Sequence, residues 1–411
     1  MNSKNINKSK VSIVMDGSRR NYDVAVALHI ERCLYRMFAD WYAVPGSIAA
    51  LTARIVRTTY PGLGQRMMER YTPSIPSELV SRNSLLAIRL NLNRSRFRTI
   101  DEFVFESSKK TSAWIKKCGF GETTGIYCYI RTIDTHLCRL AREMGIKLVG
   151  EQMIAPAEIE LEELEAQQAK WPGWEISGPL DGLRLARTVE NETWPLLDKI
   201  VAPSLYVVEG LQRVGVAPSK IELVPYPADF ESIGFVDRAK RMGPLRVGFV
   251  GQVNLRKNAP VFLEIAKQLQ HDSFVFEMVG KCSISEAKKA AYSDFVSFSG
   301  SIPRSRVSEK LRMFDVFLFP STCEGAAGAV FEAMASGLPI ITTRNSGTPV
   351  VHGREGFIHA PDDIDGFIES IKLLQSDKEL RLQMGVAAHQ YVQKLTLTNY
   401  GRDLVRVFDS V

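Results

Sequence analysis

Short apolar runs rich in β-branched residues alternate with longer stretches of helical periodicity along the whole chain. Val11–Met15, Leu245–Val250 and Val316–Phe319 are such runs, and a loop and a helical pattern follow each of them. This alternation is typical of βαβ units, in which helices connect the strands of a parallel sheet. The sequence therefore predicts an α/β protein.

The length of 411 residues favours two or three domains. A break with little periodicity, bounded by prolines, lies at residues 225–244, and the alternating pattern restarts after it. We expect two doubly wound, Rossmann-like domains facing each other across a cleft, with residues 1–230 in the first and residues 231–395 in the second. Ligands of such sheets lie at the carboxyl ends of the strands.

The pattern predicts individual elements in both halves. The expected strands are Val11–Met15, Gly125–Ile130, Lys147–Gly150, Lys199–Ala202, Leu245–Val250, Phe274–Val279, Val296–Phe298, Val316–Phe319 and Pro339–Thr342. A first helix is expected from about Tyr22 to Met37. Residues 52–93 are basic and helical or irregular, and the pattern gives them no definite order.

Positive charge is concentrated in the first half of the chain. Residues 54–117 carry 13 Lys and Arg against 5 Asp and Glu, whereas residues 245–411 carry 19 against 18. Such a region suits nucleic acid, an anionic membrane surface or a phosphate-bearing ligand. No nucleic-acid-binding signature accompanies it, so nucleic acid is the least favoured partner.

Other features argue against several classes of protein. The six cysteines form no CxxC pair, and the six histidines show no HExxH spacing, so we expect reduced thiols and no metal site. No run approaches the ~20 apolar residues of a membrane span. The first residues lack the apolar core of a signal peptide, which favours the cytoplasm.

The most informative stretch is FPSTCEGAAGAVFE, residues 319–332, which runs from a strand through a loop into a helix. Its small residues let a ligand approach the backbone, and free amides at the start of a helix suit an anion such as a diphosphate. Glu324 and Glu332 can accept hydrogen bonds from sugar and ribose hydroxyls. The alternative is that Glu324 caps the helix and Glu332 is an ordinary surface residue.

A second loop, GQVNLRKN at residues 251–258, follows the first strand of the same half. Arg256 and Lys257 are well placed there to neutralise phosphate charge. Two solvated cations before a helix are the simpler alternative.

Together these motifs resemble the retaining nucleotide-sugar glycosyltransferases of family four, which have the GT-B fold. The resemblance covers about residues 200–395 and rests on E-x7-E within FPSTCEG…EAMASGLP, the GQVNLRK loop, LVPYPAD, GSIPRSRV and the EGF of Glu355–Phe357. The details resemble the exopolysaccharide and lipopolysaccharide branch. In this fold the last segment, residues 396–411, returns to the N-terminal domain.

The resemblance implies roles for individual residues. Glu324 would contact the hydroxyls of the transferred sugar, and Lys257 with Arg256 would neutralise the diphosphate leaving group. Glu332 would hold the ribose. The remaining donor-binding positions are Gly17, Gly251, Gln252, Ile302, Gly325, Gly328 and Ala329.

The sequence departs from the family pattern at two places. Gln252 stands where many members have a phosphate-binding arginine, and Glu151 and Gln152 stand where many have a cleft histidine. His136 is near in sequence, but its helical context favours a packed or solvated side chain.

The resemblance implies transfer of a sugar from a UDP- or GDP-linked donor to an acceptor hydroxyl, with retention at the anomeric carbon and without a metal or other cofactor. The acceptor would be a glycan or lipid-linked sugar in surface polysaccharide or glycolipid synthesis, met at the inner face of the cytoplasmic membrane. A soluble acceptor is the alternative for the basic region. Two other functions stay open: an epimerase or hydrolase on the same fold, and a non-catalytic nucleotide-sugar-binding subunit.

Overall fold

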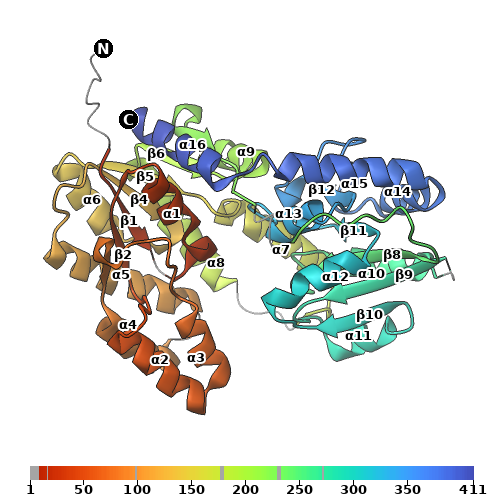
Figure 1. Ribbon diagram of the computed structural model, residues 1–411, viewed down its shortest axis with the longest axis horizontal. Coiled ribbons are helices and arrows are strands. Elements are labelled where there is room, and N and C mark those ends of the chain that lie inside the picture. Colours follow the sequence, from red (N-terminus) through yellow and green to blue (C-terminus); the bar gives the residue numbers. More distant parts are fainter. Residues whose placement is uncertain (1–8, 16, 98–99, 176–179, 229–232, 271–272) are drawn as a thin grey trace.

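The computed structural model describes residues 9–15, 17–97, 100–175, 180–228, 233–270 and 273–411. Its elements form two lobes side by side, each built around one parallel sheet with helices on both faces (Figure 1). The fold is α/β, as the alternating pattern predicts.

The first lobe contains a seven-stranded sheet in the order β3-β2-β1-β4-β5-β6-β7. Its strands are β1 Val11–Met15, β2 Leu34–Ala39, β3 Val80–Arg82, β4 Gly125–Tyr129, β5 Lys147–Glu151, β6 Lys199–Ala202 and β7 Ile221–Leu223, and every pair is parallel. All five residues of β1 and of β4 are buried, because helices cover both faces of the sheet.

The second lobe contains a six-stranded parallel sheet in the order β10-β9-β8-β11-β12-β13. Its strands are β8 Leu245–Val250, β9 Phe274–Val279, β10 Val296–Gly300, β11 Val316–Phe319, β12 Ile340–Thr343 and β13 Gly356–His359. One large apolar core surrounds this sheet, and Phe249 and Phe319 stack at its centre with ring centroids 5.4 Å apart.

Helices connect the strands. They are α1 Asp23–Ile30, α2 Ile48–Thr59, α3 Pro61–Met68, α4 Ser84–Leu92, α5 Ile100–Cys118, α6 Thr135–Glu143, α7 Ala157–Lys170, α8 Asp181–Thr193, α9 Leu205–Arg213, α10 Ala259–Gln268, α11 Glu286–Ala291, α12 Val307–Met313, α13 Gly328–Ala335, α14 Ile364–Ser376, α15 Lys378–Val392 and α16 Leu397–Asp409. Within the described residues, none of these helices combines the length and apolar character needed to cross a bilayer.

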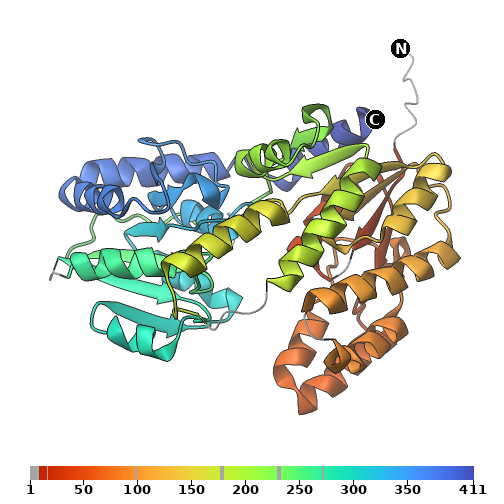
Figure 2. The same cartoon turned by 180° about the vertical axis from the view of Figure 1, so that it is seen from behind.

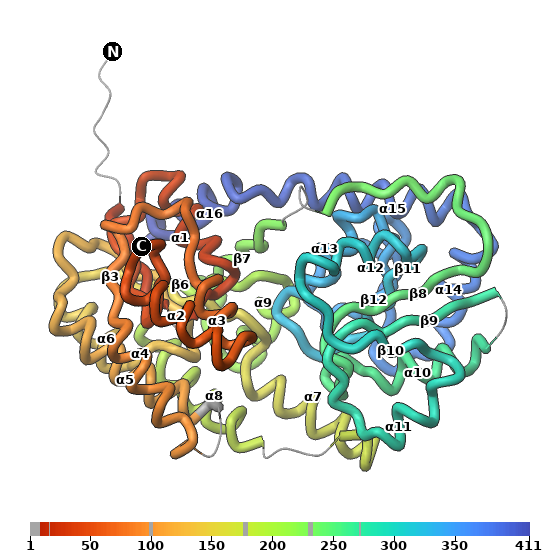
Figure 3. Tube along the Cα trace, turned by 60° about the horizontal axis from the view of Figure 1, so that its bottom comes forward, coloured from red at the N-terminus to blue at the C-terminus, as the bar shows by residue number. Residues whose placement is uncertain are grey.

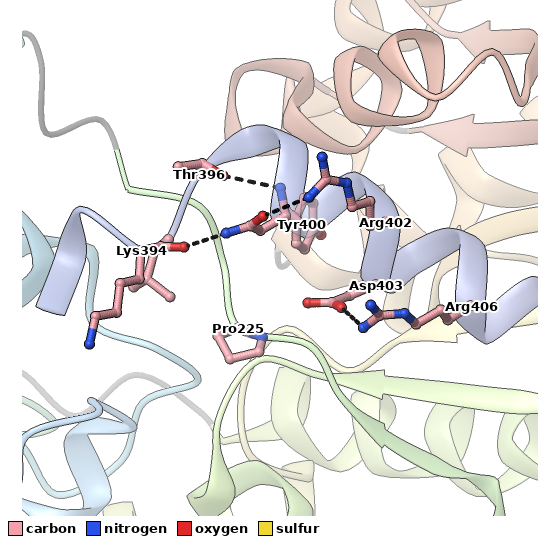
Figure 4. A pocket seen from close by; sticks show the side chains of 9 residues that line it. Pro225, Lys394, Thr396, Tyr400, Arg402, Asp403 and Arg406 are labelled. Atoms are coloured by element: carbon pink, nitrogen blue, oxygen red, sulfur yellow. Dashed lines mark hydrogen bonds and ion pairs between the residues drawn. The ribbon is translucent and has the colours of Figure 1, made fainter.

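The chain crosses between the lobes at residues 225–228 and 394–396. The two crossings are bonded to each other, since the amide of Ala228 donates to the carbonyl of Leu395 at 2.9 Å. Beyond the second crossing α16 packs against α1 of the first lobe (Figure 3). A cavity of about 270 Å³ lies between Pro225 and α16, and Asn399 ties the start of that helix to the carbonyl of Lys394 (Figure 4).

A third segment joins the lobes on the opposite side, where α7 extends toward the second lobe (Figure 2). Trp174, which follows α7, is buried in the core of the second lobe and packs against Tyr292. The carboxylate of Glu175 accepts a hydrogen bond from the amide of Leu255 at 2.8 Å. The expected boundary at residues 230 and 231 lies outside the described residues.

The structure differs from the sequence-based elements in two respects. The helix expected to reach Met37 is wrong, because α1 ends at Ile30 and Leu34–Ala39 form β2 after a turn in which Arg32 has a φ of 58°. The short strands β3, β7 and β13 were not expected. β3 and β7 each contain three residues and lie at the two edges of the first sheet, so their sequence pattern is weak.

Candidate active site

The loop after β8 brings Arg256 and Lys257 to the carboxyl edge of the second sheet. Gly251 leaves the strand with a φ of 152°, and a Cβ there would lie 3.3 Å from the Cδ of Lys257. Asn258 is fully buried in a left-handed conformation and donates to the carbonyl of Pro361 at 2.8 Å. These contacts fix the loop, so that both cations point back over the end of the neighbouring strand.

Glu324 follows β11 and meets both cations with one carboxylate oxygen. Its Oε1 lies 2.5 Å from Nζ of Lys257 and 2.8 Å from Nη1 of Arg256, and it also accepts from the hydroxyl of Ser321 at 3.1 Å. The sequence-predicted catalytic trio is therefore brought together in one ion-paired cluster.

Burial and ion pairing shift the pKa values of the two cations in opposite directions. Burial lowers the pKa of Lys257, and the neighbouring Glu324 only partly offsets this effect. Burial also works against the charge of Arg256, but Glu324 outweighs it and the pKa of that guanidinium is raised. The ammonium of Lys257 also lies 4.7 Å from the centroid of the Phe319 ring, which stabilises the cation.

Gly325 lies close against the backbone of the facing lobe. A Cβ on this residue would lie 1.7 Å from the carbonyl oxygen of Met153 in the first lobe, so no larger residue fits without movement. Ser204 of the first lobe also donates its hydroxyl to the carbonyl of Gly325 at 2.5 Å. The small residue predicted to admit a ligand thus admits the backbone of the facing lobe.

The start of α13 offers an anion site. No side chain caps this helix at Ala327, and Gly328 at its first position is exposed, with half-buried Ala329 behind it. Glu332 lies one turn further along and pairs with Arg304, whose Nη2 is 3.3 Å from its Oε1. The expectation that Glu332 could be an ordinary surface residue is not favoured, because its side chain is only 22% exposed.

Two cavities lie between the lobes, and a third opens beside them within the first lobe. The central cavity, about 590 Å³, is lined by Glu324, Arg256 and Gly325 of the second lobe and by residues of β4 and β5 in the first. The α13 cavity, about 920 Å³, is lined by Gly328 and Glu332. The arginine cavity, about 500 Å³, lies within the first lobe beside Gly17. Glu324 and Glu332 therefore open into different, adjoining spaces.

The other sequence-predicted donor residues are more dispersed. Gln252 is exposed in the loop after β8, and Ile302 is half-buried after β10, where it packs on the core of the second lobe. Neither lines the three cavities. Gly17 has a φ of 79°, and its amide donates to Asp40 at 3.2 Å. Gly17 lines the arginine cavity of the first lobe.

Glu151 and Gln152, which replace the cleft histidine, are both buried at the end of β5. Glu151 accepts hydrogen bonds from the hydroxyls of Tyr127, at 2.5 Å, and Tyr226. Burial raises the pKa of this carboxyl, although both tyrosines act to lower it. Gln152 donates to Glu190 at 2.6 Å and accepts from Trp194 at 3.2 Å. His136 is an exposed residue of α6, as its context predicted.

Arg20 lines all three cavities, and the motif analysis did not select it as a site residue. Its guanidinium lies 3.8 Å from the centroid of the Tyr226 ring and donates to the carbonyl of Pro227 at 3.0 Å. The available signal was its position: two arginines, Arg19 and Arg20, follow the first strand of a parallel sheet.

No group of three or more His, Cys, Asp and Glu side chains that could hold a metal ion occurs within the described ranges.

Comparison with known proteins agrees with this geometry. Residues 234–391 match the family described as glycosyl transferases group 1. The chain is 26% identical over 151 residues to the sulfoquinovosyl transferase SQD2 of Arabidopsis thaliana, a match that covers 35% of this chain and 29% of that protein. It is 29% identical over 191 residues to the UDP-Gal:alpha-D-GlcNAc-diphosphoundecaprenol alpha-1,3-galactosyltransferase of Escherichia coli, covering 42% of this chain and 49% of that one.

The chain thus spans less than half of the length of these curated relatives. The whole chain superposes on the sucrose-phosphate synthase of Thermosynechococcus elongatus with a TM-score of 0.68 at 15% identity, covering 98% of both chains. This likeness shows that both lobes share the GT-B fold. Over residues 234–391, the chain is thus similar to the group 1 glycosyl transferases.

Proposed function

We propose that the protein is a retaining glycosyltransferase that moves a sugar from a UDP- or GDP-linked donor to an acceptor hydroxyl. The observation that supports this most strongly is the ion-paired cluster of Arg256, Lys257 and Glu324, of which Arg256 and Glu324 line the central cavity. The relatives reported above are transferases, which favours this activity over an epimerase or a hydrolase.

The cluster of Arg256, Lys257 and Glu324 is suited to exchanging its ion pairs for contacts with a bound donor. A bound diphosphate would take over the contacts of Lys257 and Arg256, and the released Glu324 could then accept hydrogen bonds from hydroxyls of the sugar. The first amides of α13 would add positive potential on the other side of the phosphates, and Glu332 would hold the ribose. Charge that develops on the leaving diphosphate is stabilised by groups already in place.

Retention follows in this proposal from reaction on one face of the sugar, with the leaving phosphate taking the proton of the attacking hydroxyl. The side chains and the helix start supply the positive charge that a divalent ion supplies elsewhere. We therefore expect full turnover in excess chelator. Activity that disappears in chelator and returns with Mg²⁺ or Mn²⁺ would contradict this part of the proposal.

Release of nucleoside diphosphate from a panel of UDP- and GDP-sugars, with and without simple acceptors, tests the proposed activity. We expect turnover with one nucleotide series, and loss of it in Glu332→Ala and Lys257→Ala. A protein that binds nucleotide sugars without any turnover would be a binding subunit. Interconversion of the sugar without its transfer would indicate an epimerase.

We further propose a cytoplasmic enzyme of surface polysaccharide or glycolipid synthesis that meets a lipid-linked acceptor at the inner face of the membrane. Residues 45–97 contain eight arginines and two glutamates, without lysine or aspartate. They include α2, α3 and α4, which form one end of the first lobe (Figure 1). Arg98 of the basic region lies outside the described residues.

Helix α2 supports contact with a bilayer because its large side chains face outward. Ala49, Ala50 and Ala53 are buried, while Ile48, Leu51 and Ile55 are 79%, 58% and 60% exposed. The usual distribution on a surface helix is the reverse. Exposed aliphatic residues among arginines suit an anionic membrane surface, where apolar burial and charge attraction act together.

Sedimentation with vesicles of phosphatidylglycerol and phosphatidylcholine tests this contact. We expect binding at low salt that weakens at high salt, and a loss of about tenfold in Leu51→Ser with Ile55→Ser. Leu205→Ser, a change of a 60% exposed leucine on α9, is the matched control. If the wild type stays in the supernatant at low salt, the acceptor is soluble instead.

A further inference from the structure

The arginine cavity collects four guanidinium groups from separate parts of the chain. Arg19 and Arg20 follow β1, Arg70 follows α3, and Arg94 follows α4. The volume of about 500 Å³ lies within the range of ligand pockets, about 300–1,000 Å³. The hydroxyl of Ser107 adds a further possible hydrogen-bond donor to the lining.

The positive charge of this cavity is only partly balanced. Among the described residues that line it, Asp40 is the one carboxylate, and it pairs with Arg70. Arg20 pairs with Asp23, which is not part of the lining, at 3.3 Å. Arg94 makes no ion pair with any residue in the described part of the chain, and its guanidinium lies 5.4 Å from the centroid of the Phe103 ring. Four cations against the carboxylates of Asp40 and Asp23 leave an excess of positive charge, which attracts an anion.

The backbone that presents Arg20 is in an unusual conformation. Arg20, Asn21 and Tyr22 have φ values of 45°, 52° and 71°, three successive residues in the left-handed region without a glycine among them. Non-glycine residues in this region are strained, and conformations of this kind cluster at functional sites. The surrounding contacts hold this turn where the three cavities meet.

The arginine cavity adjoins the central cavity, and neither Arg256 nor Lys257 lines it. The linings of the two cavities share Arg19, Arg20, Val104 and Met153. Lys257, on which the donor diphosphate depends in the proposed mechanism, does not line the arginine cavity. An anion held there would extend from the acceptor side toward Glu324.

From these observations we infer that the arginine cavity is a second anion site, which binds a phosphate or diphosphate group carried by the acceptor. This inference rests on the proposed transferase function, because it assigns a chemical class to the acceptor of that reaction. The recognised chemistry is shared by lipid-linked diphosphates and by soluble sugar phosphates.

Titration with inorganic pyrophosphate in metal-free buffer, followed by calorimetry, tests the site. The variant Arg94→Gln removes one lining cation, and Arg96→Gln changes an exposed arginine on the same short helix that does not line the cavity. We measure both in the background of Lys257→Gln, which weakens the donor site. We expect Arg94→Gln to weaken pyrophosphate binding about tenfold and Arg96→Gln to leave it unchanged.

The inference would be overturned if Arg94→Gln and Arg96→Gln bound pyrophosphate with equal affinity. It would also be overturned if neither the wild type nor Lys257→Gln bound pyrophosphate. Donor turnover measured on the wild-type protein, which retains Lys257, keeps the two proposals apart. If the wild type releases nucleoside diphosphate but pyrophosphate binding does not depend on Arg94, the transferase assignment stands and the assignment of a second anion site is wrong. Binding that depends on Arg94 without turnover would retain the site and contradict the transferase.

Competition identifies the source of the anion. Farnesyl diphosphate that displaces pyrophosphate from the wild type, and does so about tenfold less well from Arg94→Gln, would indicate a lipid-linked acceptor. Displacement by α-glucose 1-phosphate, with no effect of farnesyl diphosphate, would indicate a soluble phosphorylated acceptor. Displacement by neither would overturn the assignment to an acceptor.

Discussion

Two groups of cations face the cleft, and they differ in how their charge is balanced. In the second lobe Arg256 and Lys257 are adjacent in sequence and converge on one oxygen of Glu324. In the first lobe Arg19, Arg20, Arg70 and Arg94 come from three segments and line one cavity, where Arg70 pairs with Asp40 and Arg20 with Asp23. Both cations of the second lobe are ion-paired and largely buried, whereas Arg94 of the first lobe is exposed and makes no ion pair within the described residues.

The difference follows from desolvation. Removing a cation from water is costly unless a partner of opposite charge is held close by, so the nearly buried Lys257 needs Glu324. The exposed guanidinium of Arg94 retains contact with solvent and can remain without a carboxylate. The ion-paired group of the second lobe is stable before a ligand binds. The first-lobe group, with the unpaired cation of Arg94, gains more binding free energy when an anion binds.

The largest effect is expected from the ion-paired group of the second lobe. Lys257→Ala should lower kcat/KM for donor turnover about 100-fold, because a charged contact to the diphosphate is lost and Glu324 keeps only Arg256. Lys267→Ala, which changes an exposed lysine of α10, should have no effect. Near-normal kinetics of a folded Lys257→Ala protein would show that the donor phosphates bind elsewhere.

The second effect tests whether the two groups must face each other closely. Gly325→Ala would place a Cβ 1.7 Å from the carbonyl of Met153, so the lobes must move apart. We expect kcat/KM to fall about 10- to 100-fold, because small misplacements of reacting groups are costly. Gly62→Ala, at a position with no atom within 4 Å of the added Cβ, is the control. Unchanged kinetics in Gly325→Ala would mean that this contact does not set the reacting geometry.

The smallest effect concerns Glu151. Burial raises the pKa of its carboxyl overall, although the charges of Arg20 and Arg19 act to lower it. A raised pKa in the folded state favours folding while the carboxyl is protonated, and this contribution is lost as the pH rises through the folded pKa. From about pH 5 to about pH 8, the wild type should therefore lose about 1 kcal/mol of unfolding free energy relative to Glu151→Gln.

Urea denaturation at both pH values measures this difference, with the exposed Glu192→Gln as control. Adding Arg20→Gln should raise the pKa of Glu151 further and move the loss of stability to higher pH. A pH dependence that is identical in the wild type and in Glu151→Gln would show that the carboxyl does not sense the arginine group.

Much of the second lobe was predictable from the sequence. Strands β8, β9 and β11 begin and end at the residues that the pattern indicated. Buried parallel strands are continuous apolar runs, and the loops after them carry conspicuous charged and small residues. The first lobe was harder, because α2, α3 and α4 enclose a small core made largely of alanines, which gives a weak periodic signal.

The sequence by itself determined the α/β class, the order of most strands along the chain, and the meeting of Arg256, Lys257 and Glu324. That meeting required only that two loops follow parallel strands, whose carboxyl ends share one edge of a sheet. Only the tertiary structure decided that Arg20, Arg70 and Arg94 line one cavity. Their approach depends on the left-handed turn after β1 and on the packing of helices distant in sequence, and neither is encoded in local periodicity.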